Sequence, residues 1–446
     1  LAGEGGTAAG TTIGGVYDLR TQLDRVERDR IVVRFAPETG ARVRQGELVS
    51  LNGTDLSGIR QRISGLDGAQ LFPRFPAPEE QLDELRRRGE ERTRQALPDL
   101  NLFALVRLPE LRDTLAARER LRDALAQLNG LPGVAGAWAV PLVYPATEMP
   151  GGVPAEAPSG TSGTGGNVWS DGAGGTGSAR FARSDTPDFS PLQGYLYAPP
   201  SGVWADSAWS FPGGTGMGVK VLSLEWGWLF THEDLKPPFY LTHDQGPSDH
   251  GTAVAGIYGG QHNGYGINGM APDAEIGGIW LEDLGANILE AITVLGPGDI
   301  YNMSIQIGGP EGYMPVEYSP DLFAIIQTGA ANGVCCLEAA GNGSVNLDNP
   351  LYGDYFDPRV QNSGAILCGA GTPNGLDGEW FTNYGERVSL QGWGSSVVTV
   401  CCGDLQGGDP EVLYTAGFSG TSSATPITSG SMASLQGQAR ALFGEP

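Results

Sequence analysis

Lysine is almost absent from this sequence of 446 residues, in which only Lys220 and Lys236 occur. Charged residues of every kind make up 17% of the chain, and 27 basic residues against 51 acidic ones give a net charge of −24. Such a charge repels nucleic-acid phosphates and anionic lipid surfaces. No run approaches the ~18 apolar residues that a membrane span needs. We therefore expect neither a nucleic-acid partner nor a membrane span.

Cysteine is also scarce, and its spacing argues against a metal site. The sequence contains no C-x-x-C motif, and its five cysteines are Cys335, Cys336, Cys368, Cys401 and Cys402. Neighbouring residues on a strand point to opposite faces, so only one member of each adjacent pair can reach a common partner. We expect buried thiols rather than zinc ligands, and one disulfide between the separate blocks remains open.

Glycine is abundant, with 70 residues, but it follows no Gly-X-Y period, and 40% of the chain is hydrophobic. This combination excludes collagen and wholesale disorder, and the length suffices for two or three domains.

Charge is distributed unevenly along the chain. Residues 1–144 hold 20 arginines and 20 acidic residues, whereas residues 145–446 hold 7 basic and 31 acidic ones. The two parts are therefore expected to be built differently.

The composition predicts four segments. They are an N-terminal tail at 1–30, a small α/β domain at 31–144, a Gly-rich linker at 145–185 and a larger domain at 186–446. Within the linker, residues 151–177 contain ten glycines and neither Lys nor Arg. A segment so poor in large apolar groups cannot offset the entropy lost on ordering, so we expect a flexible connection.

The small domain has the pattern of an open-faced α/β sandwich of the ferredoxin-like kind. Short apolar runs at 31–36, 102–108 and 134–140 have the length of strands. Acidic residues early and arginines late predict a helix over 78–96. A second helix is expected over 109–128, with a core-facing stripe of leucines at positions 111, 115, 121 and 125.

The larger domain alternates short buried strands with helices. Strands are expected at 219–224, 276–280, 299–305, 333–340 and 364–370, and helices at 251–258, 285–295 and 320–332. Nearly continuous apolar strands are typical of a parallel sheet covered on both faces. The sequence therefore predicts a doubly wound, mostly parallel sheet flanked by helices, with its chemistry at the carboxyl ends of the strands.

Three short segments hold an acid, an imidazole and a hydroxyl in that order. Glu225 ends a buried strand, His250 stands at the entry of a helix of small residues, and Ser422 lies in a tight Gly/Thr/Ser turn. Pro426 suits the first turn of the helix that follows. A serine becomes a good nucleophile when a neutral imidazole accepts its proton, and the imidazole needs an anion to fix its tautomer.

At these segments the chain resembles the subtilisin-like serine proteases. The GTS-x-ATP block at 420–426 and the HGT-x-VAG block at 250–256 match the family's signatures for the nucleophile and the histidine. Further matches are the acid block around Glu225, MAPDAEI at 270–276, YNMSI at 301–305 and EAAGNG at 338–343. The resemblance spans about residues 186–440 and implies the subtilisin-like fold and serine endopeptidase activity on polypeptides.

The resemblance implies a role for each matching residue. Ser422 would be the nucleophile, His250 the general base and acid, and Asn342 the side-chain donor to the oxyanion. Glu225 stands where the family has Asp, with one methylene more. One alternative is an inactive homologue that binds peptides without cleaving them. A Ser-Glu-Asp enzyme of the sedolisin type is disfavoured, because sedolisins lack the histidine of the HGT block.

The resemblance also implies a structural calcium ion. Asp234 and Asn263 stand at positions where the family helps to bind it. Calcium takes six or more oxygen ligands, many of which a Gly-rich loop can supply through its carbonyls. The alternative reading is a capping Asp and an ordinary turn Asn.

Many relatives carry an N-terminal prodomain that is both a folding template and an inhibitor, and residues 31–144 have the size for that role. An unrelated adaptor domain is the alternative. Arg180 and Arg183 are the only basic residues between positions 123 and 219, so we expect a processing cut after one of them. The resemblance further implies a secreted or periplasmic enzyme.

Overall fold

The computed structural model describes residues 24–66, 68–111, 114–147, 186–242, 246–373 and 377–445. The chain divides into two compact units. The N-terminal unit comprises Leu1–Glu84 and Asp99–Leu142, and the C-terminal unit comprises Leu85–Pro98 and Val143–Pro446. Most of the expected tail and linker, with Arg180 and Arg183, lies outside the described residues.

The N-terminal unit contains a four-stranded antiparallel sheet in the order β4-β5-β1-β6. Its strands are β1 (Val26–Phe35), β4 (Gln70–Pro73), β5 (Phe103–Arg107) and β6 (Val134–Pro141). A separate hairpin joins β2 (Ala41–Arg44) to β3 (Glu47–Ser50). The three expected strands are confirmed as β1, β5 and β6. However, β1 begins at Val26, inside the segment that was expected to be a tail.

The helices of this part of the chain are α1 (Ser57–Ser64), α2 (Glu79–Thr93) and α3 (Thr114–Asn129). The leucine stripe expected on the last helix was half wrong. Leu111 and Leu115 are 40% and 65% exposed, because Leu111 precedes α3, which starts at Thr114, and Leu115 lies on the side of the helix away from its buried residues. Its buried face instead consists of Ala117, Leu121, Ala124, Leu125 and Leu128. These positions follow the 3.6-residue period, with alanines allowing close packing.

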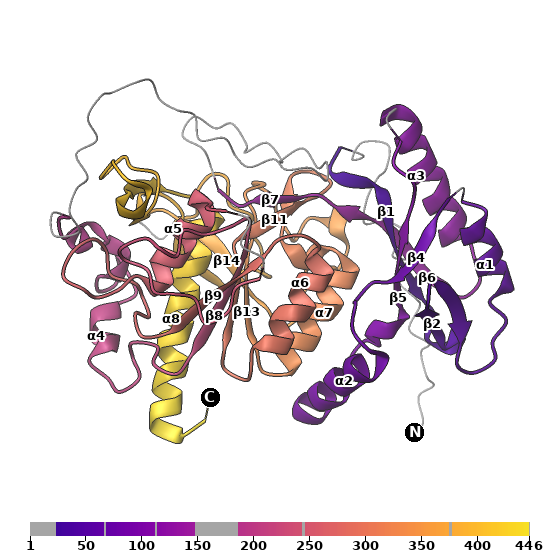
Figure 1. Cartoon of the computed structure of the whole chain (residues 1–446), viewed down its shortest axis with the longest axis horizontal. Helices are drawn as coiled ribbons and strands as arrows, with labels where there is room; N and C mark the ends of the chain where they lie inside the picture. Colours follow the sequence, from indigo (N-terminus) through magenta and orange to yellow (C-terminus); the bar gives the residue numbers. More distant parts are fainter. Residues whose placement is uncertain are drawn as a thin grey trace. The chain divides into compact units, whose positions relative to one another are not determined.

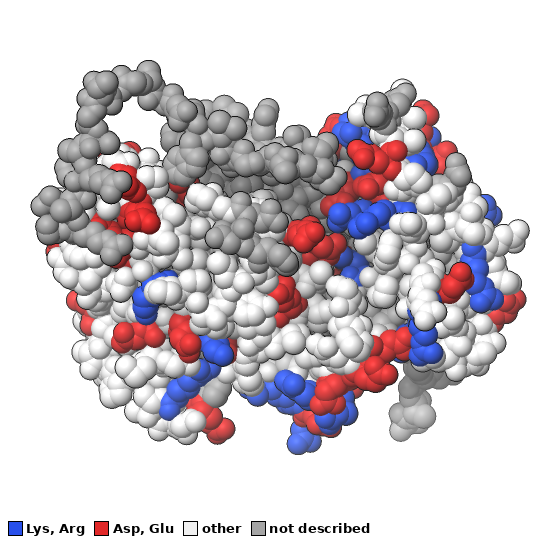
Figure 2. All heavy atoms as spheres, viewed as in Figure 1, with Lys and Arg blue, Asp and Glu red and all other residues white. Residues whose placement is uncertain are grey.

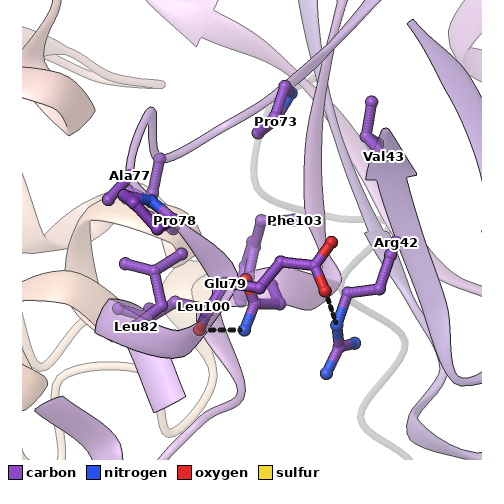
Figure 3. Close-up of a pocket in the computed structure, with 11 residues that line it drawn as sticks. Arg42, Val43, Pro73, Ala77, Pro78, Glu79, Leu82, Leu100 and Phe103 are labelled. Carbon is purple, nitrogen blue, oxygen red and sulfur yellow. Dashed lines mark hydrogen bonds and ion pairs between the residues drawn. The ribbon is translucent and has the colours of Figure 1, made fainter. Parts of the chain in front are cut away.

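A small hollow in the N-terminal unit lies between the β2 hairpin and the start of α2 (Figure 3). Glu79, in the first turn of α2, faces Arg42 from β2 with 3.8 Å between Oε2 and Nε. Arg44 donates two hydrogen bonds of 2.7 Å to the same carboxylate and thereby lowers the pKa of Glu79. Acidic and basic side chains are interspersed over this unit, at the right of Figure 2, in keeping with its balanced charge.

The C-terminal unit is built on a six-stranded parallel sheet in the order β15-β14-β13-β10-β8-β9. The strands are β8 (Lys220–Glu225), β9 (Glu275–Trp280), β10 (Ile300–Met303), β13 (Cys335–Ala339), β14 (Ile366–Gly371) and β15 (Leu390–Trp393). The chain leaves β8 toward β9 on one side and later returns to β10 on the other. Such a point, where the strand order reverses, leaves a crevice beyond the carboxyl ends of β8 and β10.

Helices cover both faces of this sheet, as the sequence predicts. They are α4 (Ala205–Trp209), α5 (Asp249–Gly259), α6 (Leu284–Val294), α7 (Pro320–Ala331) and α8 (Thr421–Phe443). Figure 1 shows the sheet between α8 on one side and α6 and α7 on the other. Among the described helices, none is long and apolar enough to cross a membrane.

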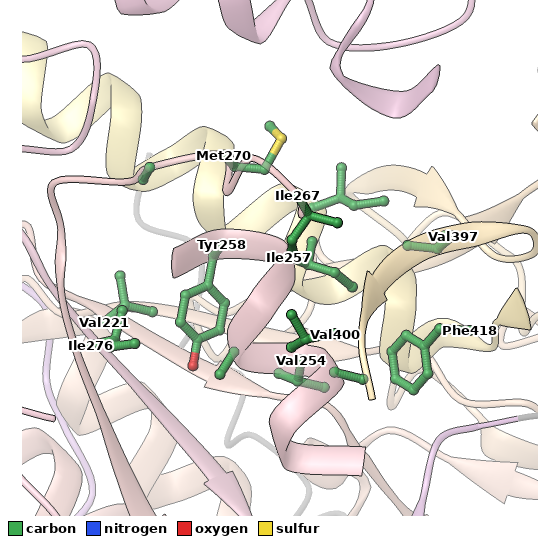
Figure 4. Packing of buried hydrophobic residues seen from close by; sticks show 14 of the residues in the cluster. Val221, Val254, Ile257, Tyr258, Ile267, Met270, Ile276, Val397, Val400 and Phe418 are labelled. Atoms are coloured by element: carbon green, nitrogen blue, oxygen red, sulfur yellow. The ribbon is translucent and has the colours of Figure 1, made fainter. Parts of the chain in front are cut away.

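The core of the C-terminal unit surrounds α5. Tyr258 lies beside Val221 and Ile276 of the sheet, and the helix's other end packs toward Val400 and Phe418 (Figure 4). All five side chains are at most 6% exposed. Burial of such side chains stabilises by roughly 1.5–3 kcal/mol each, so the helix that begins near His250 is firmly held.

Two smaller antiparallel sheets lie in the same unit. One has the order β12-β11-β7 and consists of β7 (Val143–Pro145), β11 (Ile305–Gly308) and β12 (Tyr313–Met314). The other pairs β16 (Val397–Val400) with β17 (Tyr414–Phe418). After β17 the chain enters α8 at Thr421, so Pro426 lies in the second turn rather than in the expected first turn. At that position a proline removes one hydrogen bond of the helix.

Three charged side chains are buried together beside β13. Glu338 is fully buried, and Glu317 and Arg387 are 1% and 3% exposed. Arg387 Nη2 donates to Glu317 Oε2 at 2.6 Å, and the Glu317 backbone N–H donates to Glu338 Oε2 at 3.0 Å. Burial, together with the charge of Glu317, raises the pKa of Glu338 well above its ordinary value. One arginine is thus buried with two carboxyl groups, and its surroundings favour the neutral form of Glu338.

We predict that Glu338→Gln flattens the dependence of stability on pH. The pKa of Glu338 is higher in the folded protein than in the unfolded one, so this carboxyl contributes its full stabilisation at pH values below the pKa of the unfolded state. The contribution is lost as the pH rises through the pKa of the folded state. Glutamine cannot ionise, so between pH 5 and pH 8 the melting temperature of the variant should fall less than that of the parent. Thermal melts in a Ser422→Ala background, which prevents self-digestion, measure this.

Glu282→Gln is the matched control, because Glu282 is exposed. An equal fall in melting temperature for parent and Glu338→Gln would show that Glu338 does not titrate in this range.

Candidate active site

The acid of the site is the last residue of β8, Glu225, whose side chain has no solvent exposure. Its Oε2 lies 2.7 Å from His250 Nδ1, whereas Oε1 has no hydrogen-bond partner among the described residues. Burial raises the pKa of Glu225, and the neighbouring imidazole of His250 opposes that rise. The carboxylate therefore depends on His250 for its stabilisation.

Glycine at position 251 lets the start of α5 lie close to the residues that follow β8. His250 is the second residue of α5, and its neighbour Gly251 faces the Glu225 side chain. A Cβ added to Gly251 would lie 2.1 Å from the Gly227 carbonyl oxygen and 3.1 and 3.2 Å from Cβ and Cγ of Glu225. The first of these distances is a clash, so only glycine lets the start of α5 approach the end of β8 so closely.

Ser422 supplies the hydroxyl of the site. Ser422 is the second residue of α8, after Gly420, whose φ of 92° lies in the left-handed region that favours glycine. Its Oγ lies 2.8 Å from His250 Nε2 and donates to the Ser304 carbonyl at 2.9 Å. The structure thus brings Glu225, His250 and Ser422 into hydrogen-bonding reach of one another at the carboxyl ends of the strands.

Asn342 lies beside Ser422 with its amide held in one orientation. Its Oδ1 accepts hydrogen bonds from the backbone N–H and the hydroxyl of Thr421, at 3.0 and 2.8 Å. Its Nδ2 is buried and has no partner within the described part of the chain. Because the oxygen end is engaged, the nitrogen end is left as a preorganised donor, which is what an oxyanion requires.

Two aromatic rings flank His250. The Phe418 ring lies 5.6 Å from the imidazole and the Trp226 ring 6.4 Å, both in edge-to-face geometry. Trp226 follows the acid directly, whereas Phe418 ends β17. Such rings fix the orientation of the imidazole and limit its contact with water.

A segment of the chain itself lies over the hydroxyl. The Ala146 carbonyl accepts a hydrogen bond from the Ser422 backbone N–H at 2.8 Å, and the Ala146 N–H lies 3.4 Å from the Ser304 carbonyl. A Cβ added to Gly420 would lie 2.1 Å from that Ala146 oxygen. The peptide bond between Ala146 and Thr147 therefore lies directly against the nucleophile position.

The residues before Ala146 form β7, which pairs antiparallel with β11. Pro145 is opposite Ile305, Tyr144 is opposite Gln306 and Val143 is opposite Ile307. Gln306 also reaches the segment with its side chain, because its Nε2 donates to the Pro145 carbonyl at 2.8 Å. The segment thus lies in the extended conformation, held by backbone pairing that is independent of its side chains.

The expected calcium ligands are neighbours, but their atoms do not fit a cation. Asp234 Oδ1 accepts from Asn263 Nδ2 at 2.6 Å, and Oδ2 accepts from the Ile267 N–H at 2.7 Å and lies 2.9 Å from the Tyr414 hydroxyl. Calcium needs oxygen ligands, whereas this carboxylate faces N–H and O–H donors. Burial, opposed by these hydrogen bonds, raises the pKa of Asp234 to about 6. Among the described residues no cluster of three or more His, Cys, Asp or Glu could hold a metal ion.

The remaining candidates are placed as follows. Cys401 and Cys402 are bonded to each other rather than to another block, whereas Cys335, Cys336 and Cys368 are free. Burial raises the pKa of Cys368 to about 12, so this thiol is un-ionised.

His232 lies in the turns between β8 and α5 and is 1% exposed. Its Nε2 lies 3.0 Å from the Leu413 carbonyl oxygen, and burial lowers its pKa to about 4. His243 lies outside the described residues.

Comparison with known families gives one match. The model of the subtilase family matches residues 231–443, a range that contains His250, Asn342 and Ser422 and begins after Glu225.

Among curated proteins, the chain is similar to the minor extracellular protease Epr of Bacillus subtilis (strain 168) and to subtilisin BL of Lederbergia lenta. The first is 27% identical over 52% of this chain and 34% of its own length. The second is 28% identical over 49% of this chain and 76% of its own. The chain thus spans only about a third of the length of the Bacillus relative.

Among solved structures, fervidolysin from Fervidobacterium pennivorans, a keratinolytic enzyme related to subtilisin, is similar in fold. It aligns with a TM-score of 0.52 and 16% identity over 92% of this chain and 55% of its own. This likeness supports a parallel sheet flanked by helices.

We predict that the hydrogen bonds around Asp234 stabilise the protein without a cation. Tyr414→Phe removes one donor to a buried carboxylate and should lower the free energy of unfolding by about 1–3 kcal/mol. That loss should be equal in excess calcium and in excess EDTA, measured by denaturant unfolding of the Ser422→Ala chain. Tyr384→Phe is the control, because Tyr384 is 54% exposed.

If calcium raises the denaturant midpoint of unfolding in the parent but not in Asp234→Asn, a cation binds here.

Proposed function

The chain belongs to the subtilase family through its C-terminal unit, and from its site we propose that it is a serine endopeptidase that hydrolyses peptide bonds through an acyl-enzyme. One observation supports this most strongly. Hydrogen bonds run from the buried carboxylate of Glu225 through both ring nitrogens of His250 to Ser422 Oγ, at 2.7 and 2.8 Å. Nucleophilic catalysis by serine requires this arrangement of acid, base and hydroxyl.

In the first step His250 Nε2 takes the proton of Ser422 while Oγ attacks the substrate carbonyl carbon. The imidazolium then gives that proton to the leaving amine, and the acyl-enzyme remains on Ser422. Water repeats the sequence with His250 as base, which frees the carboxyl product and restores the hydroxyl. Glu225 stays ionised throughout, because it stabilises the imidazolium that forms in each half-reaction.

The oxyanion has two donors. The Ser422 backbone N–H already donates to the Ala146 carbonyl, and Asn342 Nδ2 is buried with no partner in the described part of the chain. Both groups are fixed before the reaction, so they stabilise the developing charge without reorganisation. Removal of one such donor commonly costs about 3 kcal/mol of barrier.

The N-terminal α/β unit is proposed to be a prodomain, with the ferredoxin-like arrangement expected from its sequence. Support comes from the C-terminal end of this part of the chain, since β7 leads into the site and Ala146 binds the oxyanion donor. The first self-cleavage is therefore proposed at Ala146–Thr147 rather than after Arg180 or Arg183. Polypeptides are the substrates, and the secreted or periplasmic compartment is proposed because the relatives include an extracellular protease.

No observation favours the inactive, peptide-binding alternative. Ser422 lies 2.8 Å from His250, and Nδ2 of Asn342 is buried with no partner among the described residues.

We predict that Glu225→Ala lowers kcat by about 10⁴ on a peptide substrate, because His250 loses the group that orients and stabilises it. Glu225→Gln keeps the size of the side chain but not its charge, so its kcat should fall by a similar factor. Active-site titration with a fluorophosphonate, which should label Ser422 stoichiometrically in the parent and not in Ser422→Ala, gives the enzyme concentration. A loss of less than tenfold for Glu225→Ala would remove Glu225 from the mechanism.

A second prediction concerns the full chain. On incubation it should convert to fragments 1–146 and 147–446, identified by intact mass, whereas Ser422→Ala should remain whole. A first fragment that ends at residue 180 or 183 would instead support the cut expected from the sequence. A cut in Ser422→Ala would point to a contaminating protease.

A further inference from the structure

The Gln306 side chain of β11 lies between Asn342 and Pro145, the residue that precedes Ala146. Gln306 is 2% exposed, and both ends of its amide are engaged. Its Oε1 accepts from the Asn342 backbone N–H at 2.8 Å, and its Nε2 donates to the Pro145 carbonyl at 2.8 Å. The amide thus joins the residue that supplies the oxyanion donor to the peptide group that precedes Ala146.

Strand register places this amide on the side toward which the Ala146 side chain points. Gln306 is directly opposite Tyr144, and directly opposed residues of an antiparallel pair have their side chains on the same face. Ala146 is two residues after Tyr144, so its side chain points to that face as well. The Ala146 side chain itself has no solvent exposure.

A longer side chain at position 146 would compete with Gln306 for this space. Displacing the amide would leave the Asn342 N–H and the Pro145 carbonyl without their partners in a buried site. Unpaired buried polar groups are costly, so the site would reject the longer residue. Alanine, glycine or serine would leave both hydrogen bonds intact.

From this geometry we infer that Gln306 is a specificity-determining residue, which restricts the residue before the cleaved bond to small side chains. The inference rests on the proposed endopeptidase function and deepens it. The substrate class is an extended polypeptide with Ala, Gly or Ser at that position, and the chain's own Val143–Ala146 is the first example.

Self-cleavage provides the test within the full chain. Ala146→Phe should slow the appearance of fragment 147–446 by about 10- to 100-fold, and Ala146→Ser should leave it within about threefold of the parent. Gln306→Ala vacates the space but leaves the same two groups unpaired whatever residue is at position 146, so rescue is read as equal rates for the double variant Ala146→Phe with Gln306→Ala and for Gln306→Ala alone. Such rescue would also show that the Ala146→Phe chain folds.

Two control variants separate size from other effects. Gln306→Glu keeps the volume and the acceptor for the Asn342 N–H, so it should not rescue Ala146→Phe. Gln391→Ala alters an exposed glutamine of β15 and should change nothing.

Peptides provide a second readout that is independent of folding of the position 146 variants. The self-cleaved parent and Gln306→Ala would be compared on quenched peptides containing Val-Tyr-Pro-X-Thr, where X is Ala, Leu or Phe. The ratio of kcat/KM for Ala over Phe should exceed about 10 in the parent and fall by about tenfold or more in Gln306→Ala.

The possible failures are distinguishable. If the parent labels with fluorophosphonate but cleaves X = Phe as fast as X = Ala, or if Gln306→Ala leaves the ratio unchanged, the role of Gln306 is overturned and the endopeptidase function stands. If the parent neither labels nor cleaves any peptide, the proposed function fails, and the specificity assigned to Gln306 fails with it.

Discussion

A carboxylate with no solvent exposure is the constraint on which the rest of the site depends. Glu225 is buried at the end of β8, and a single oxygen is engaged, by His250. A buried charge is tolerated only where a partner stabilises it, so His250 must stay in place for the fold as well as for catalysis. Gly251 lets α5 begin close to this strand end, because a side chain there would clash with the Gly227 carbonyl oxygen.

The Ser304 carbonyl links the nucleophile to the strand that is bound beside it. It accepts the Ser422 hydroxyl at 2.9 Å and lies 3.4 Å from the Ala146 N–H. One atom thus sets the position of the attacking oxygen relative to the backbone of the bound segment, while β11 sets the register. Proximity of this kind contributes much of the rate of a hydrolase, because the reacting groups meet without further loss of entropy. It follows that a change in the β11 strand affects catalysis even though the strand provides no reacting group.

The sequence predicts the larger domain well, because buried parallel strands and their helices follow from local apolar runs. Glu225, His250, Ser422 and Asn342 could be named because each lies in a short motif. The contributions of Phe418 and Gln306 could not, since they arise from pairing between distant strands and leave no local pattern. Local periodicity also failed at Leu111 and Leu115, because Leu111 precedes the start of α3 at Thr114 and Leu115 lies on the side of the helix away from its buried residues. The position of Pro426 was missed for the same reason, because the helix begins at Thr421.

The surroundings of Asp234 show how a correct pairing of residues can still lead to the wrong chemistry. Spacing placed Asp234 beside Asn263, and the two do lie 2.6 Å apart. What they can bind depends on a third residue, Tyr414, which comes from β17 and presents a hydroxyl to the same carboxylate. A carboxylate that accepts three hydrogen bonds has little need of a cation, and the donors around it would repel one. The loop therefore keeps the length expected of a calcium site, while its stability comes from hydrogen bonds that connect the loop to β17, directly ahead of the helix that holds Ser422.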